Sequence, residues 1–153
     1  MTVVLDPRDL SRGQRQALQR DKDFGDLAEE LVAEEYGLEG LGLDPEWWDL
    51  RHPTRTTKYQ VKSTSSTVGD KYPGDGRFRV WKGQNRSLVA SDAQATAWYA
   101  FVLFDEDAGL LRIQRMKPST VGRLVRERGG WNTSGHQSQG QQHKLPYGEV
   151  FDL

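Results

Sequence analysis

The sequence predicts a single α/β domain, in which about five strands are flanked by helices. Apolar residues fill residues 97–104, a run short enough to be a buried central strand. Phe24, Leu27 and Leu31 recur at helical spacing, and Gly37 follows as a stop signal. Residues 58–64 alternate with the period of a strand. With 153 residues, all these elements fit one domain, 1–153.

Composition narrows the class of protein. Only 35% of the residues are hydrophobic, but five Trp, five Tyr and five Phe supply bulky core material. The absence of cysteine excludes disulfides and thiolate metal sites. No apolar run is long enough for a membrane span, and the first residues lack a secretory signal. We therefore expect a cytoplasmic protein that makes no use of a membrane.

Charge is unevenly distributed along a chain whose net charge is −1. Residues 1–50 carry 5 basic and 13 acidic side chains, whereas residues 51–90 carry 9 basic and 2 acidic ones. Residues 110–144 carry 7 basic and 1 acidic. Two basic blocks on a near-neutral chain indicate a face that binds a polyanion such as DNA. The alternative is that these side chains only solvate two loops.

The remaining elements follow from local signals. Residues 1–22 are predicted to be an N-terminal helical extension, with one polar helix from Asp6-Pro7 to about Arg20. The other predictions are short strands at 47–51 and 77–81, a short helix opening near Ser87 or Ser91, a hairpin partner at 110–115, a helix at 118–128, a long polar loop at 131–144 and a last strand at 145–151 that closes the sheet.

The stretch with the most chemistry runs from Trp47 to Thr64. Asp49 is followed eleven residues later by Gln60, and Lys62 lies two further on. Strand parity places Gln60 and Lys62 on one face and Tyr59 and Val61 on the other. Phosphodiester hydrolysis needs a divalent cation, and Mg²⁺ takes oxygen ligands while keeping several waters.

An oxygen-lined metal site can be assembled from this stretch. Asp49 is the candidate anchor, with the amide oxygen of Gln60 and the carbonyl of Val61 as further ligands. Glu29, beside the apolar stripe of its helix, is expected to bind the metal directly or through a water. Lys62 would steady the attacking water or the scissile phosphate.

Together, Glu29, Asp49 and the Gln60-x-Lys62 pair resemble the pattern of the PD-(D/E)XK nuclease superfamily. The stretch GDLAEELV, with Gly25 four residues before Glu29, is similar to the first helix of archaeal Holliday-junction resolvases. KYQVKST is similar to the third motif of those resolvases and of Mrr-like endonucleases. The resemblance implies a restriction-endonuclease-like core with a mixed central sheet, and residues 29, 49, 60 and 62 as its catalytic set.

Two departures keep other interpretations open. Trp48 replaces the proline that often precedes the aspartate, and Gln60 replaces the usual acid. An amide lacks the carboxylate's charge, so its metal affinity should be lower. The simplest alternative is an Asp–Lys pair across two strands of an ordinary sheet.

DNA contacts are expected from basic residues that follow the motif. The candidates are Arg55, Lys71, Arg77, Arg79, Lys82 and Arg86, interleaved with Tyr72, Phe78 and Trp81. Phe78 and Trp81 are equally well explained as core. Ser63 and Thr64 either contact a phosphate or simply finish a strand. His136 and His143 lack zinc-ligand spacing, but their loop could contact DNA.

The sequence thus predicts a DNA endonuclease that uses Mg²⁺, with Mn²⁺ as a substitute, on branched or otherwise structured DNA. One site cuts one strand, so cleavage of a duplex or junction calls for a homodimer. The alternative is a catalytically weak or inactive DNA-binding module of the same fold, which Gln60 favours. A protein unrelated to nucleic acid is a third class.

Overall fold

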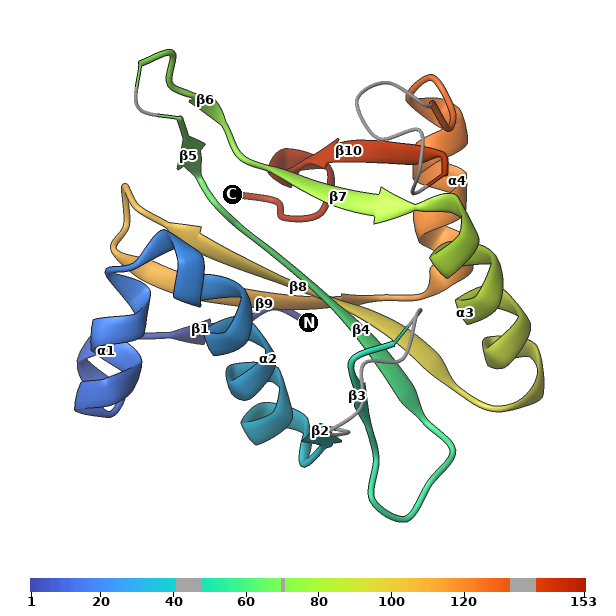
Figure 1. Cartoon of the computed structure of the whole chain (residues 1–153), viewed down its shortest axis with the longest axis horizontal. Helices are drawn as coiled ribbons and strands as arrows, with labels where there is room; N and C mark the ends of the chain where they lie inside the picture. Colours follow the sequence, from blue (N-terminus) through green and yellow to red (C-terminus); the bar gives the residue numbers. More distant parts are fainter. Residues whose placement is uncertain (41–47, 70, 133–139) are drawn as a thin grey trace.

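The computed structural model describes residues 1–40, 48–69, 71–132 and 140–153 (Figure 1). Its helices are α1 (Arg12–Leu18), α2 (Asp21–Tyr36), α3 (Lys82–Gln94) and α4 (Pro118–Glu127). Its strands are β1 (Val3–Leu5), β2 (Glu39–Gly40), β3 (Leu50–Arg51), β4 (Lys58–Ser65), β5 (Thr67–Val68), β6 (Gly74–Asp75), β7 (Arg77–Trp81), β8 (Ala97–Asp105), β9 (Leu110–Met116) and β10 (Gln142–Pro146). Short 3₁₀ turns cover Pro7–Asp9 and Tyr147–Glu149.

The central sheet is mixed and has six strands in the order β1-β9-β8-β4-β3-β2. β4 and β8 are parallel, and every other neighbouring pair is antiparallel. A parallel pair needs a crossover, and the crossover here contains β7 and α3. The predicted mixed sheet flanked by helices is therefore confirmed, with β1 as an additional edge strand.

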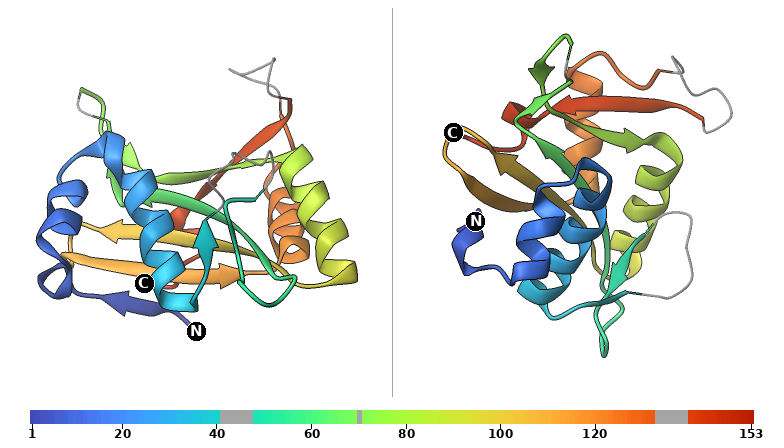
Figure 2. Two further views of the ribbon diagram at one scale, coloured as in Figure 1. Left: turned by 60° about the horizontal axis from the view of Figure 1, so that its bottom comes forward. Right: turned by 60° about the vertical axis from the view of Figure 1, so that its left-hand side comes forward.

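Each face of the sheet has its own hydrophobic core. On one face, Phe24, Leu27 and Leu31 of α2 pack against Tyr59 and Val61 of β4. A second core lies between the opposite face and the layer of α4 and β7, and includes Phe78, Tyr99, Phe101, Leu103, Val121 and Leu145. Figure 2 shows α1 and α2 on one side of the sheet and α3 and α4 on the other. Because β8 is buried on both faces, its sequence is apolar from Ala97 to Phe104, up to the aspartate at its end.

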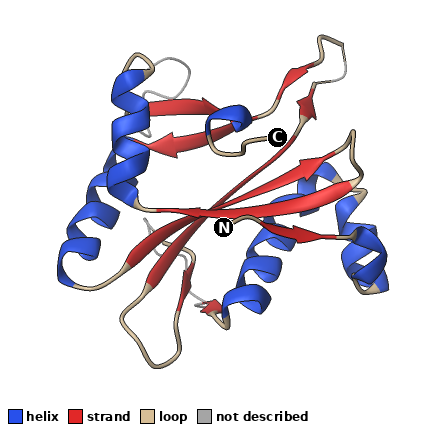
Figure 3. Ribbon diagram, turned by 180° about the vertical axis from the view of Figure 1, so that it is seen from behind, coloured by secondary structure: helices blue, strands red, loops and turns tan. Residues whose placement is uncertain are grey.

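Two pairs of strands lie outside the six-stranded sheet, as Figure 3 shows from behind. β7 and β10 form an antiparallel ribbon, and β5 and β6 form a short arm that projects from the end of β4. The prediction that residues 145–151 close the sheet is wrong. The last strand begins earlier, at Gln142, and pairs with β7 instead. Part of the predicted loop at 131–144 is therefore strand, while residues 133–139, including His136, lie outside the described residues.

The N-terminal segment is not one helix. A 3₁₀ turn ends before Ser11, which caps α1 in a capping box with Gln14. The Ser11 side chain accepts from the Gln14 backbone, and the Gln14 side chain accepts from the Ser11 backbone. Such a box starts a new helix at that point, so the continuous helix predicted for residues 6–20 is broken.

Two further elements begin elsewhere than the sequence predicted. The helix expected near Ser87 or Ser91 is α3, which starts at Lys82 directly after β7 and runs for 13 residues. Its Gly, Ser and Asn content disfavours a helix, but Asn85 and Leu88 are buried, and tertiary packing overrides propensity. The strand expected at 47–51 is limited to Leu50–Arg51, and Trp47 lies outside the described residues. Among the described helices, none is both long and apolar enough to cross a membrane.

Candidate active site on β4

The residues around Asp49 are brought together by the β3–β4 pairing. Asp49 immediately precedes β3, and its backbone N–H donates to the carbonyl of Tyr59 at 2.8 Å. Its Oδ2 accepts from the backbone N–H of Val61 and from Nε2 of Gln60, both at 2.8 Å. Charge-assisted hydrogen bonds of this length hold the carboxylate firmly against β4. Three of the predicted site residues therefore form one contact cluster.

The alternation predicted for β4 is confirmed. Tyr59 and Val61 belong to the core under α2. Lys62 projects to the other face, where its Nζ donates to Oε1 of Gln84 on α3 at 3.0 Å. Gln84 was missed from the sequence because α3 was expected to start later, which left this residue in a loop. Recognition that the helix begins at Lys82 would have placed Gln84 in the first turn of the helix.

Lys62 lies near charges of both signs, those of Asp49 and Arg79. Although part of its side chain is exposed, the pKa of Lys62 is lowered to about 8 by the sum of three effects: desolvation lowers it, the charge of Asp49 raises it, and the charge of Arg79 lowers it. Desolvation is the largest of these effects. A partly desolvated ammonium attracts an anion that enters the site more strongly than it would in water, because the local dielectric constant is lower.

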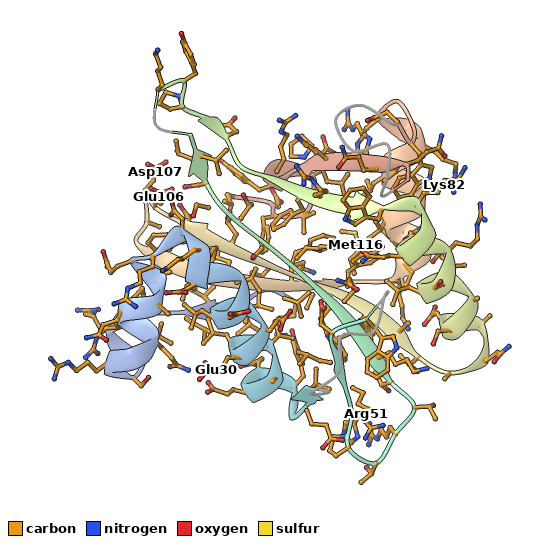
Figure 4. The ribbon with its side chains drawn as sticks, viewed as in Figure 1. Glu30, Arg51, Lys82, Glu106, Asp107 and Met116 are labelled. Atoms are coloured by element: carbon orange, nitrogen blue, oxygen red, sulfur yellow. The ribbon has the colours of Figure 1, made fainter. Side chains whose placement is uncertain are left out.

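Glu29 lies half-buried on α2, the helix that covers the Tyr59 and Val61 face of β4. Its neighbour Glu30 is exposed and, with Glu34, accepts hydrogen bonds from Nε2 of Gln14 at 3.0 and 3.1 Å. Glu30 therefore faces α1, and Figure 4 shows it on the outer side of α2. The two glutamates have different surroundings, as expected from residues on opposite flanks of one stripe. A role for Glu29 in metal binding stays a prediction.

The donor set fits an oxygen-seeking cation. Oε1 of Gln60 is buried and has no hydrogen-bond partner, which is costly for a polar atom unless a ligand satisfies it. It belongs to the same side chain whose Nε2 contacts Asp49. Within the described ranges no three His, Cys, Asp or Glu side chains converge as a metal site. A cation here would therefore rely on Asp49 with amide and carbonyl oxygens, which suits Mg²⁺ because it keeps several waters.

The six predicted DNA-binding residues do not form one patch. Arg55 lines a cleft with Tyr36, Trp98 and Arg115, beyond the start of β4. Lys71 is exposed on the β5–β6 arm, next to Tyr72. Arg77 and Arg79 project from β7, and Arg86 is exposed on α3. Lys82, labelled in Figure 4 at the junction of β7 and α3, donates to Oε1 of Gln141.

The aromatic residues interleaved with these cations also differ in their surroundings: some are buried in the core and others are exposed. Phe78 is fully buried, so it is core rather than a stacking platform. Tyr72 is 83% exposed on the arm, and Trp81 lies partly exposed with Arg79 over its ring. His143 is buried, and its Nδ1 is 3.1 Å from the carbonyl oxygen of Gly130, so this histidine joins β10 to the end of α4 rather than facing a ligand.

Comparison with protein families gives a match over nearly the whole chain. Residues 15–152 match the model of the PD-(D/E)XK nuclease superfamily domain. The chain belongs to this superfamily. The match includes Glu29, Asp49, Gln60 and Lys62, and it supports a nuclease-type, hydrolytic function. Nucleases of this superfamily typically use divalent metals. No curated protein matches the chain, and the closer likeness to Holliday-junction resolvases and Mrr-like endonucleases stays a prediction.

Proposed function

We propose that this protein is a DNA endonuclease that hydrolyses phosphodiester bonds with Mg²⁺, for which Mn²⁺ can substitute. The observation that carries the proposal is the contact of the Asp49 carboxylate with Nε2 of Gln60, whose Oε1 is buried and unsatisfied, on the strand that also presents Lys62. Oxygen donors beside a cationic side chain are what phosphodiester cleavage requires. Membership of a nuclease superfamily supports this interpretation.

Each residue has a distinct task in this proposal. Asp49, Gln60 and the Val61 carbonyl hold the cation, and Glu29 contributes a second carboxylate. The cation supplies charge neutralisation and Lewis acidity at the phosphate. Lys62 holds the attacking water or the scissile phosphate through its ammonium, and Gln84 fixes the direction of that ammonium by accepting one of its hydrogens. Arg55, Lys71, Arg77, Arg79, Lys82 and Arg86 contact the DNA backbone.

One feature favours a second candidate function. Nε2 of Gln60 donates to Asp49, so the carboxylate already has donors in the protein itself. A carboxylate at position 60 would instead repel Asp49 and favour a cation between them. The second candidate is therefore a nuclease-fold module that binds DNA for a partner but cleaves weakly or not at all.

Cleavage assays separate the two candidates. Purified protein is incubated with supercoiled, linear, branched and single-stranded DNA, with Mg²⁺, with Mn²⁺ or with chelator. Metal-dependent nicking that is abolished by Asp49→Asn and Lys62→Ala, but retained by the exposed controls Asp107→Asn and Lys22→Ala, supports the enzyme. DNA binding without cleavage of any substrate supports the module, and weak binding that is independent of salt contradicts both.

A homodimer belongs to the same proposal. Since one chain carries one such site, a double-strand break requires two copies. Linear product that forms from supercoiled DNA without prior accumulation of nicked circles would support two copies acting together. Analytical ultracentrifugation with and without DNA measures the stoichiometry directly.

A further inference from the structure

The β7–β10 ribbon carries apolar side chains on its buried face and positively charged side chains on its exposed face. Phe78 and Val80 of β7 and Leu145 of β10 are fully buried against the second core. The alternate positions Arg77, Arg79 and Lys144 are all exposed. Alternation along both strands thus gathers three positive charges on the outer face of the ribbon.

Two of these charges face each other directly. Arg79 and Lys144 are cross-strand partners in the ladder, and like charges in that relation destabilise a sheet. In the described part of the chain, neither residue takes part in an ion pair, and neither does Arg77. The arrangement is unfavourable in the free protein and would be relieved by a bound anion.

A hollow of about 280 Å³ lies at these charges and is lined by Ser63, Thr64, Val68, Arg77, Arg79 and Lys144. Three cations and two hydroxyls thus line it, with no acidic side chain among them. A larger cleft of about 530 Å³ shares Ser63 and Thr64, but its lining includes Asp21 and Glu106. A phosphate would therefore be attracted to the first and repelled by the second.

The position of the ribbon relative to β4 is fixed by Gly76. Its N–H donates to the carbonyl of Ser66 at 3.0 Å, and a Cβ at this residue would overlap the backbone of Ser65. Only glycine permits this close approach. The hollow therefore lies against the part of β4 that directly follows Lys62, and Arg79 is close enough for its charge to affect Lys62.

We propose that the hollow formed by Ser63, Thr64, Arg77, Arg79 and Lys144 binds a backbone phosphate of the DNA strand, next to the phosphodiester held at Lys62. This inference rests on the proposed function and deepens it. The contact reads no base, so it anchors any sequence and sets the direction in which the strand crosses β4. Lys144 was missed from the sequence because it was assigned to a loop, whereas the ladder places it opposite Arg79.

Binding without cleavage tests this site directly. A fluorescent DNA duplex of about 12 base pairs is titrated in EDTA at several salt concentrations, with wild type and with Arg79→Gln/Lys144→Gln. We expect the double variant to bind at least about tenfold more weakly and the slope of log K against log salt to be smaller by about 1, because one phosphate contact is lost. The matched control is Arg12→Gln/Lys22→Gln, which removes two exposed charges from α1 and α2 and should leave both quantities near the wild-type values.

The outcomes are distinct. Because the variant removes a like-charge pair, its melting temperature should equal or exceed that of the wild type, so loss of binding cannot be attributed to unfolding. A double variant that binds DNA as well as its control overturns the site, whether or not the protein cleaves. An acidic peptide such as polyglutamate that binds with equal affinity and equal salt slope also overturns it. Lost binding in the double variant of a protein that never cleaves supports the site and contradicts the proposed function.

Discussion

The two faces of β4 differ sharply in what they do. On one face, Tyr59 and Val61 are buried under α2, where the ring of Tyr59 stacks on that of Tyr36 at a centroid distance of 5.6 Å. On the other face, Gln60 contacts Asp49 and Lys62 contacts Gln84. The face with Tyr59 and Val61 packs the sheet against α2. The face with Gln60 and Lys62 carries polar groups whose burial lowers the stability of the folded chain.

The polar groups that destabilise the free protein are the ones that we expect to contact a ligand. A desolvated lysine and an unsatisfied amide oxygen both lower the stability of a folded chain, and they occur on the same face of the same strand. Such groups are common at functional sites because a bound ligand compensates them. Substitutions on the two faces should therefore have opposite patterns of effect on stability and on activity.

The largest expected effect comes from Asp49→Asn. The amide oxygen can still accept from Val61 N–H, but the charge that holds the cation is lost, so cleavage should fall by about 100-fold or more. Metal-dependent nicking of supercoiled DNA measures the loss, and the exposed Asp107→Asn is the control. Equal activity of the two variants would remove Asp49 from the site.

Lys62→Met should stabilise the metal-free protein. Because its folded pKa of about 8 lies below the unfolded value of 10.5, the unfolded chain binds more protons between these values, and stability rises with pH through that window. The cost of the buried ammonium is therefore complete below pH 8. We expect Lys62→Met to raise the free energy of unfolding by about 1–3 kcal/mol at pH 7 and to lose this advantage towards pH 10.

Urea denaturation in EDTA at pH 7, 8.5 and 9.5 measures this difference. Lys22→Met, on the exposed side of α2, should leave stability nearly unchanged at every pH. An advantage for Lys62→Met that does not vary with pH would show that burial of the charge is not its cause.

Val61→Ala tests the opposite face. Its side chain is buried in the core under α2, so truncation should reduce the free energy of unfolding by about 1–2 kcal/mol. Its carbonyl, the proposed metal ligand, is unchanged, so cleavage per folded molecule should stay within about twofold of wild type. Val89→Ala, at a partly exposed position on α3, should cost less than about 0.5 kcal/mol. If Val61→Ala lost cleavage but kept normal stability, that result would contradict the assignment of core packing to one face of β4 and of the polar site to the other.

Gln60→Glu is expected to change metal binding rather than core packing. A second carboxylate beside Asp49 should lower the melting temperature without metal and tighten Mg²⁺ binding by about tenfold, or about 1.4 kcal/mol. Thermal shift with and without Mg²⁺ measures both effects, and Gln16→Glu on α1 controls for the added charge. A Mg²⁺-induced shift equal to that of wild type would place the cation away from residue 60.

The sequence predicted the elements that carry strong local patterns. The parity of β4, the stop at Gly37 and the buried strand β8 all follow from side-chain periodicity, so the central motif was found with them. The sequence did not predict the features that depend on pairing between strands distant along the chain. No local signal shows that Gln142–Pro146 pairs with β7, so the ribbon, and Lys144 opposite Arg79, became visible only in the fold. The start of α3 was missed for a related reason, since packing overrides its weak propensity.

The central claim is that Asp49 and Gln60 hold a divalent cation. Titration of the metal-free protein with Mn²⁺, followed by electron paramagnetic resonance, tests it without any assumption about substrate. We expect one Mn²⁺ per chain in the wild type and in Asp107→Asn, and loss of that binding in Asp49→Asn. Undiminished Mn²⁺ binding in Asp49→Asn would contradict the claim.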